Sequence, residues 1–170
     1  MEDQLIIVID YKNPPLAEDI GTLFSALAKD YKNVSRGRVL AVASIDHGSI
    51  IVTLVDWAFQ VLPYVKASVE IAKGAKALAD FGKLLRDSFI AAKSPTSAKL
   101  PPPTTGKRSV HRSMKAFARM AAENRCNIRL KHTGADGETF EVEMTSAEAV
   151  EAQNVLEAPK VIRETPEIAG

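Results

Sequence analysis

The side chains that most often bind transition metals are few in this sequence, and their spacing is not that of metal ligands. The chain contains one cysteine, Cys126, and three histidines, His47, His111 and His132. No two of them form a His-x-x-x-His or Cys-x-x-Cys pair, the spacings that bring two ligands to one side of a local turn. We therefore expect no metal site and no cofactor. A single cysteine also excludes an internal disulfide.

One short run contains the residue types of a hydrolase triad, in the order Asp46-His47-Gly48-Ser49. Adjacent residues in a tight turn point apart, whereas catalytic triads are assembled from residues that are distant in sequence. We interpret this run as the turn of a β-hairpin.

A second run, Thr105-Gly106-Lys107-Arg108-Ser109, resembles the end of a phosphate-binding loop. Pro101 replaces the first glycine of that motif, and no apolar strand precedes it. The resemblance to a phosphate loop therefore fails. The sequence predicts no enzyme activity and indicates no small-molecule substrate.

Basic side chains recur at helical spacing in the second half of the chain. Residues 93–132 contain 10 Lys/Arg and one acid, a net +9, whereas residues 133–170 contain 2 Lys/Arg and 9 acids, a net −7. Steps of four, three and four residues place the first members of the set on one face of a helix predicted over 107–124. The candidate basic contact face comprises Arg108, Arg112, Lys115, Arg119, Arg125, Arg129 and Lys131.

Three kinds of partner fit such a basic face. The favoured one is acidic protein surface, either the following acidic segment of the same chain or a partner protein. Nucleic acid is the second, because several cations on one face gain affinity by releasing counterions from phosphates. An anionic membrane surface is less favoured, because the opposite helix face (Val110, Met114, Phe117, Ala121) is small for insertion into lipid.

The stretch that organises the chain runs from Gly48 to Phe89. It begins as an apolar strand around 50–55. From Asp56, which we interpret as a helix N-cap, the apolar residues recur at helical spacing. Pro63 is expected to mark the start of the long helix or a kink in it. The helix is rich in small residues, which allow close approach of another backbone. This close approach would serve packing of the helix either on the chain's own sheet or on a second copy of the chain. The candidate helix-contact face comprises Val65, Ala72, Gly74, Ala75, Leu78, Ala79 and Gly82.

The remaining patterns predict an α+β or small α/β fold. Residues 5–9 form an apolar strand, 15–32 an amphipathic helix, and 38–45 with 50–55 a hairpin. A crossover helix after the first strand predicts a parallel neighbour. Helix 15–32 is expected on one sheet face, with the long helix covering the other face or projecting away. Residues 127–132 and 138–144 alternate as a second hairpin, whose outward charges match across the strands, before a last helix from Thr145.

Four segments follow from these elements. Residues 1–91 form a β-α-β-β-α unit, 92–106 a Pro-rich linker, 107–158 a small α-β-β-α unit and 159–170 a flexible tail. No apolar run reaches the ~18 residues of a spanning helix, and the N-terminus does not resemble a signal peptide. We expect a soluble, cytoplasmic, non-enzymatic protein-interaction or oligomerisation module, with a homo-oligomer or a larger protein as partner and nucleic-acid binding as the alternative.

Overall fold

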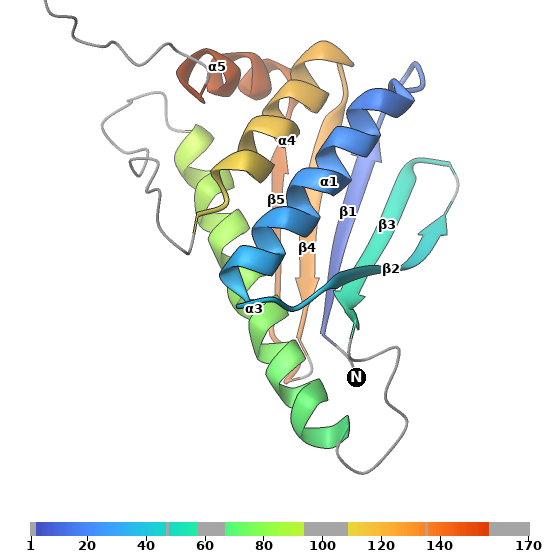
Figure 1. Cartoon of the computed structure of the whole chain (residues 1–170). Helices are drawn as coiled ribbons and strands as arrows, with labels where there is room; N and C mark the ends of the chain where they lie inside the picture. The colour runs from blue at the N-terminus through green and yellow to red at the C-terminus, as the bar shows by residue number, and fades with distance from the viewer. Residues whose placement is uncertain (1–2, 47, 58–66, 94–108, 135, 157–170) are drawn as a thin grey trace, which may run out of the picture.

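The computed structural model describes residues 3–46, 48–57, 67–93, 109–134 and 136–156. In this part of the chain, helices and an antiparallel sheet form an α+β fold (Figure 1). The elements in chain order are β1 (Gln4–Asp10), α1 (Ala17–Val34), β2 (Leu40–Asp46), β3 (Ile50–Asp56), α3 (Ala67–Lys93), α4 (His111–Glu123), β4 (Asn127–Thr133), β5 (Thr139–Met144) and α5 (Ser146–Leu156).

The strands form one sheet in the order β2-β3-β1-β4-β5, and every neighbouring pair is antiparallel. The predicted parallel neighbour of the first strand is therefore wrong. β2 does run parallel to β1, but β3 lies between them. The reason lies in composition: β3 is an almost continuous apolar run that suits an interior place, whereas β2 contains Ala41, Ala43 and Ser44 and takes the margin.

The described helices lie on one face of this sheet (Figure 1). Leu5, Ile7 and Ile9 of β1 point into that face and are completely buried, because α1, α3 and α4 cover them. The expectation that the long helix would cover the opposite face or project away is wrong. Its buried stripe, Leu78, Phe81, Leu85 and Phe89, packs into the same core as α1 and α4.

The second predicted hairpin is confirmed, and so is the capping box of the last helix. β4 and β5 pair in register, with Arg129 opposite Glu143 and Lys131 opposite Glu141. Thr145 and Glu148 exchange the two hydrogen bonds of a capping box, at 2.9 and 3.2 Å.

The two predicted units share one sheet, because β4 pairs along the whole of β1, from Gln4–Thr133 to Asp10–Asn127. α4 also packs on α1. The predicted Pro-rich linker at 92–106 lies outside the described residues apart from 92–93, which belong to α3, and the predicted tail at 159–170 lies wholly outside them.

Candidate functional site

The outer margin of β2 is the most exposed apolar region of the sheet. In the described part of the chain no strand pairs with this margin. Val42 is 51 % exposed and Ile45 is 62 % exposed, and both lie on the face of the sheet that the helices cover further along. At the end of the β2–β3 hairpin, the Trp57 N–H donates to the Val39 carbonyl at 2.7 Å, and both side chains are about half exposed. Val39 and Trp57 follow the Leu40–Asp56 pair and therefore lie on the other face of the sheet. We call Val39, Val42, Ile45 and Trp57, which flank this margin on both faces, the β2 edge patch.

Sheet margins in natural proteins usually carry features that prevent pairing with another chain, such as lysine, proline or a covering element. β2 contains no Lys, Arg or Pro, and its one charged residue is Asp46 at its end. A register shift between Val42 and Ser44 leaves Ala43 as a bulge, which is the one protective feature within the strand. By comparison, Leu16, Ile90 and Val150 are exposed apolar residues on three separate helices or helix ends.

The opposite margin, β5, is built differently. Its helix-side residues Phe140 and Val142 are partly buried against the core, and Met144 is completely buried. The other face of β5 carries Glu141 and Glu143. Two β5 strands brought side by side would place acid against acid, so this margin opposes self-pairing.

A buried ion pair holds the β2–β3 end of the sheet to the helices. Asp56, 4 % exposed, accepts hydrogen bonds from Arg38 Nε at 2.9 Å and Arg38 Nη2 at 3.1 Å. The Tyr31 hydroxyl of α1 also donates to Asp56. Burial and the Asp56 carboxylate raise the pKa of the Tyr31 phenol far above its ordinary value, so the hydroxyl keeps its proton and remains a donor. The helix for which Asp56 is the predicted N-cap falls on residues outside the described part.

Gly74 of α3 lies directly against this cluster of Arg38, Asp56 and Tyr31. A Cβ added at Gly74 would lie 2.6 Å from Asp56 Oδ1, closer than atoms in contact can approach, and 3.0 Å from Arg38 Nη2, which is a tight contact. A side chain at this position is therefore excluded while Asp56 is held by its partners. The close approach that the small-residue pattern predicts is used here by the chain itself.

The rest of the predicted helix-contact face is divided between the core and the surface. Leu78 is completely buried, and Gly82 lies over Leu5, His132 and Phe140 of the sheet. Ala75 and Ala79 are half-buried, and Ala72 is exposed. Val65 lies outside the described residues.

His132 of β4 lies under α3 and is 4 % exposed. Its ring stacks on Phe140, with 5.3 Å between ring centroids, and its Nε2 lies 3.4 Å from Asp3 Oδ1 without the geometry of a hydrogen bond. Burial lowers the pKa of His132 below its ordinary value, against the opposing effect of the Asp3 carboxylate. The imidazole is therefore neutral at neutral pH and lies inside the protein.

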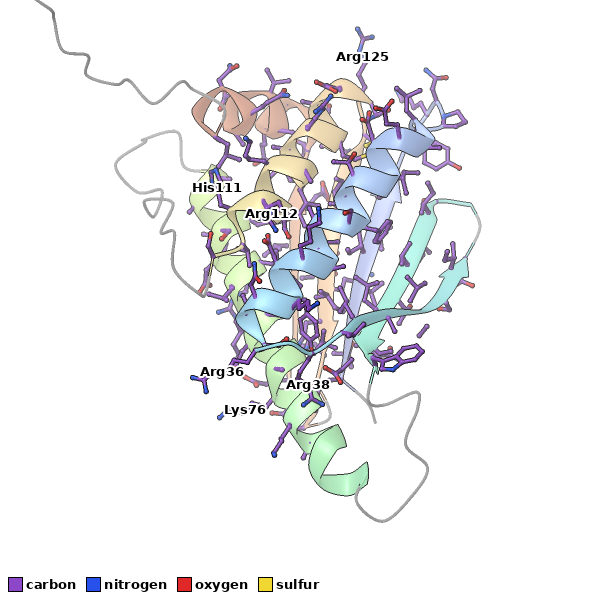
Figure 2. All side chains as sticks on the ribbon, in the orientation of Figure 1. Arg36, Arg38, Lys76, His111, Arg112 and Arg125 are labelled. Carbon is purple, nitrogen blue, oxygen red and sulfur yellow. The ribbon has the colours of Figure 1, made fainter. Side chains whose placement is uncertain are left out.

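The predicted basic face is divided between two sides of the molecule. Arg112, Lys115 and Arg119 are exposed on α4, whereas Arg129 and Lys131 lie on the opposite face of the sheet, because they alternate with the core residues of β4. Figure 2 shows Arg112 over the helical layer and Arg125 projecting from one end of the molecule. Arg108 lies outside the described residues.

Several of these cations have partners within the chain. Arg129 binds Asp10 at 3.1 Å and Glu141 at 3.8 Å, and Arg119 binds Glu123 at 3.1 Å. The apolar face of α4, with Met114, Phe117 and Ala121, is buried in the core. A membrane-inserted α4 would have to leave that core.

The basic surface gains two residues that the sequence pattern did not indicate. Asp30 of α1 accepts hydrogen bonds from the Ser113 N–H and hydroxyl, both at 2.7 Å, and so caps the start of α4. This contact brings the C-terminal part of α1, with exposed Lys29 and Lys32, beside Arg112 and Lys115. We call Lys29, Lys32, Arg112 and Lys115 the α1–α4 cationic surface.

Comparisons with protein-family models, curated proteins and solved structures find no match for this chain. Among the described helices, none combines the length and the apolar character needed to cross a bilayer. Within the described residues, no group of three or more His, Cys, Asp or Glu side chains is placed to hold a metal ion. Two surfaces, the β2 edge patch and the α1–α4 cationic surface, are the candidates for function.

Proposed function

We propose that this protein is an interaction module that binds another polypeptide at the margin of β2. The observation that carries the proposal is the β2 edge patch: half-exposed Val39, Val42, Ile45 and Trp57 beside a strand margin that no described strand occupies. Strand addition satisfies the free backbone donors and acceptors of such a margin, and the neighbouring side chains supply apolar contact. No small-molecule chemistry is required by this proposal.

The test uses a photo-crosslinking residue at position 45 of the full chain, with position 141 as the matched control on the opposite margin. We expect ultraviolet light to produce specific covalent adducts from position 45, whether to the same protein or to another one. Position 141 should produce few, because β5 carries acids and is packed against α3. Equal labelling from both positions, or none from position 45, would contradict the proposal.

The α1–α4 cationic surface supports a second candidate function, binding of a nucleic-acid backbone. The specific observation is that the exposed Lys29 and Lys32 of α1 lie beside Arg112 and Lys115 of α4, and the one ion pair that these four cations form with described residues is that of Arg112 with the buried cap residue Asp30, at 3.9 Å. Several cations on one surface bind phosphates with a strong salt dependence.

The nucleic-acid candidate is tested by measuring duplex DNA binding at two salt concentrations. Lys29→Glu with Lys115→Glu should abolish salt-sensitive binding, whereas Lys131→Glu on the opposite sheet face should leave it nearly unchanged. Equal loss in both variants would mean that net charge, and not this surface, determines binding.

A further inference from the structure

The α1–α4 cationic surface continues along the helical layer in both directions. Steps of three and four residues, which keep side chains on one face of a helix, relate its lysines on α1 to an exposed arginine just after that helix, and the same steps recur on α4. Figure 2 shows Arg36 toward one end of the helical layer and Arg112 in its middle. We call these six exposed residues the cationic track: Lys29, Lys32, Arg36, Arg112, Lys115 and Arg119.

Contacts at both ends hold α1 and α4 in a fixed antiparallel alignment. Asp30, near the end of α1, accepts hydrogen bonds from Ser113 at the start of α4. At the other end of the pair, the Asn124 side chain accepts a hydrogen bond from the Leu16 N–H at 3.0 Å and donates one to Asp19 at 2.8 Å. The cations on the two helices therefore belong to one rigid array.

The Asp30–Ser113 contact lies near the middle of the cationic track. Arg36 follows Asp30 by six residues, and Arg119 follows Ser113 by six residues in the opposite direction. With a helical rise of about 1.5 Å per residue, the track is about 18 Å long.

Charges of one sign dominate this length of the helical layer. The structure describes α1 and α4 completely, and their exposed acids are Glu18 and Glu123, which both lie at the end away from Arg36. Between residues 111 and 120 of α4, the exposed residues are the three cations of the track. A solvated protein surface usually mixes both signs, whereas an extended row of like charge fits an extended polyanion.

We propose that the cationic track binds the phosphate backbone of duplex DNA over about five base pairs, without reading the base sequence. This inference rests on the second function proposed above, nucleic-acid binding, and specifies its ligand. Each strand of B-DNA advances about 3.4 Å per nucleotide, so a track of about 18 Å corresponds to about five base pairs. Contacts with phosphates fix the position of a protein on DNA but do not distinguish bases.

The aromatic side chains of the two helices favour a duplex over a single strand. Tyr31 and Phe117 are completely buried, and Phe24 is partly buried against the core. Proteins that bind single strands stack the bases on exposed aromatic side chains, and α1 and α4 expose no Phe, Tyr or Trp in this way. A duplex requires no such stacking, because its bases are already paired and its phosphates face outward.

The first measurement is the dissociation constant of the full chain for a short labelled DNA duplex over a range of salt concentrations. Each phosphate contact contributes about −0.9 to the slope of log K against log salt. We expect a slope between about −3.6 and −5.4, which corresponds to four to six phosphates. The lower number applies if Arg112 and Arg119 stay with Asp30 and Glu123, their partners within the chain. A slope shallower than about −2, or no binding at low salt, would overturn the inference.

Two arginine-to-glycine variants test the extent of the track. Arg36 and Arg125 are both exposed and have φ angles of 61° and 52°, in the left-handed region that glycine adopts readily, so neither substitution strains the backbone. Arg36→Gly should raise the dissociation constant several-fold and make the salt slope shallower by about 0.9. Arg125→Gly is the matched control beyond Glu123, outside the track, and should leave the slope unchanged. Equal effects of the two variants would mean that net charge, and not the track, determines binding.

A single strand of the same length tests the choice of a duplex. It should bind more weakly than the duplex, because the track offers no side chain on which bases stack. Two duplexes of unrelated sequence should have the same dissociation constant. A single strand that binds as tightly as the duplex, or a preference of more than about tenfold for one duplex sequence, would overturn the inference.

Lys29→Glu with Lys115→Glu separates failure of this inference from failure of the proposed nucleic-acid function. If that variant loses DNA binding while Arg36→Gly binds like the parent chain, the surface binds nucleic acid but the track does not extend to Arg36, and the inference fails alone. If the double variant also binds DNA like the parent chain, both fail.

Discussion

The two margins of the sheet differ in how strongly they oppose pairing with another strand. β5 carries Glu141 and Glu143 on one face and packs against α3 on the other, so a free strand has little reason to join it. β2 has no charged residue before Asp46 at its end, and no described helix covers Val42 and Ile45. The margin that lacks protection is also the one that a buried ion pair holds to the helical layer. These contacts of Asp56 with Arg38 and Tyr31 fix the open end of the β2–β3 hairpin against α1.

The largest effect is expected from removing the carboxylate that holds the β2 margin. Asp56→Ala leaves Arg38 and the Tyr31 hydroxyl without their shared acceptor in a buried place. We expect the free energy of unfolding to fall by about 3 kcal/mol, measured by urea denaturation. Asp87→Ala, which removes an exposed acid bound to Arg86, is the control and should cost less than about 0.5 kcal/mol. A loss of similar size in both variants would contradict the role of the buried cluster.

The second comparison uses two glycines of α3, one toward each margin. Gly74→Ala pushes a methyl group against Asp56, so we expect a net destabilisation of about 1 to 2 kcal/mol despite the better helix propensity of alanine. Gly82→Ala meets Phe140, His132 and Leu5 at 3.4–3.6 Å, which is ordinary contact, so the gain in helix propensity of up to about 1 kcal/mol should remain. Thermal unfolding of both variants measures the difference. If Gly74→Ala were the more stable of the two variants, the close approach of position 74 to Asp56 would be contradicted.

The third effect is a pH dependence on the β5 side. Because the pKa of His132 is lower in the folded protein than in the unfolded chain, the unfolded chain takes up the proton first as pH falls. Stability should therefore decrease as pH falls through about 6.5, the unfolded value, and level off below the folded pKa. His132→Gln should flatten the stability curve between about pH 7.5 and 5.5. Asp3 and Asp136 raise the pKa of this imidazole and Lys83 lowers it, so Lys83→Met should raise the pKa of His132 toward its ordinary value.

The smallest effect should come from the cation that covers Phe140 near the β5 margin. The Arg86 guanidinium lies 5.2 Å from the centre of the Phe140 ring and is partly exposed. Arg86→Met keeps apolar cover over the ring and loses the charge, so we expect a loss of about 0.5 kcal/mol. A loss of stability as large as that of Asp56→Ala would contradict the small contribution expected of this contact, and urea denaturation measures both.

The secondary structure was predictable because each element has a clear period. β1 is continuously apolar, α1 has an apolar stripe, and the β4–β5 hairpin alternates, so each interpretation followed from local sequence. The sheet order was not predictable, because the pairing of β1 with β4 joins residues on either side of a proline-rich segment. Local periodicity carries no information about which distant strand becomes a neighbour.

The candidate surfaces were predictable only in part. The alternation of Arg129 with Ile128 and Leu130 does indicate that Arg129 points away from the core, and therefore away from the basic face of α4. The exposure of Val42 and Ile45 has no such signal, because the run Leu40 to Ile45 resembles an ordinary half-buried strand. Whether a strand lies at a margin depends on the neighbours, which the strand itself does not specify.

The pairing of β1 between β3 and β4 also has a consequence for the order in which the chain acquires structure. β1 leaves the ribosome before β4, so one side of β1 must wait for β4, since residue 4 pairs with residue 133. During that interval the apolar residues 5–9 of β1 have one unoccupied side. A break in the chain between residues 93 and 109 would therefore separate two fragments that each lack part of the sheet. Such fragments, produced together, should reassemble by inserting β4 alongside β1.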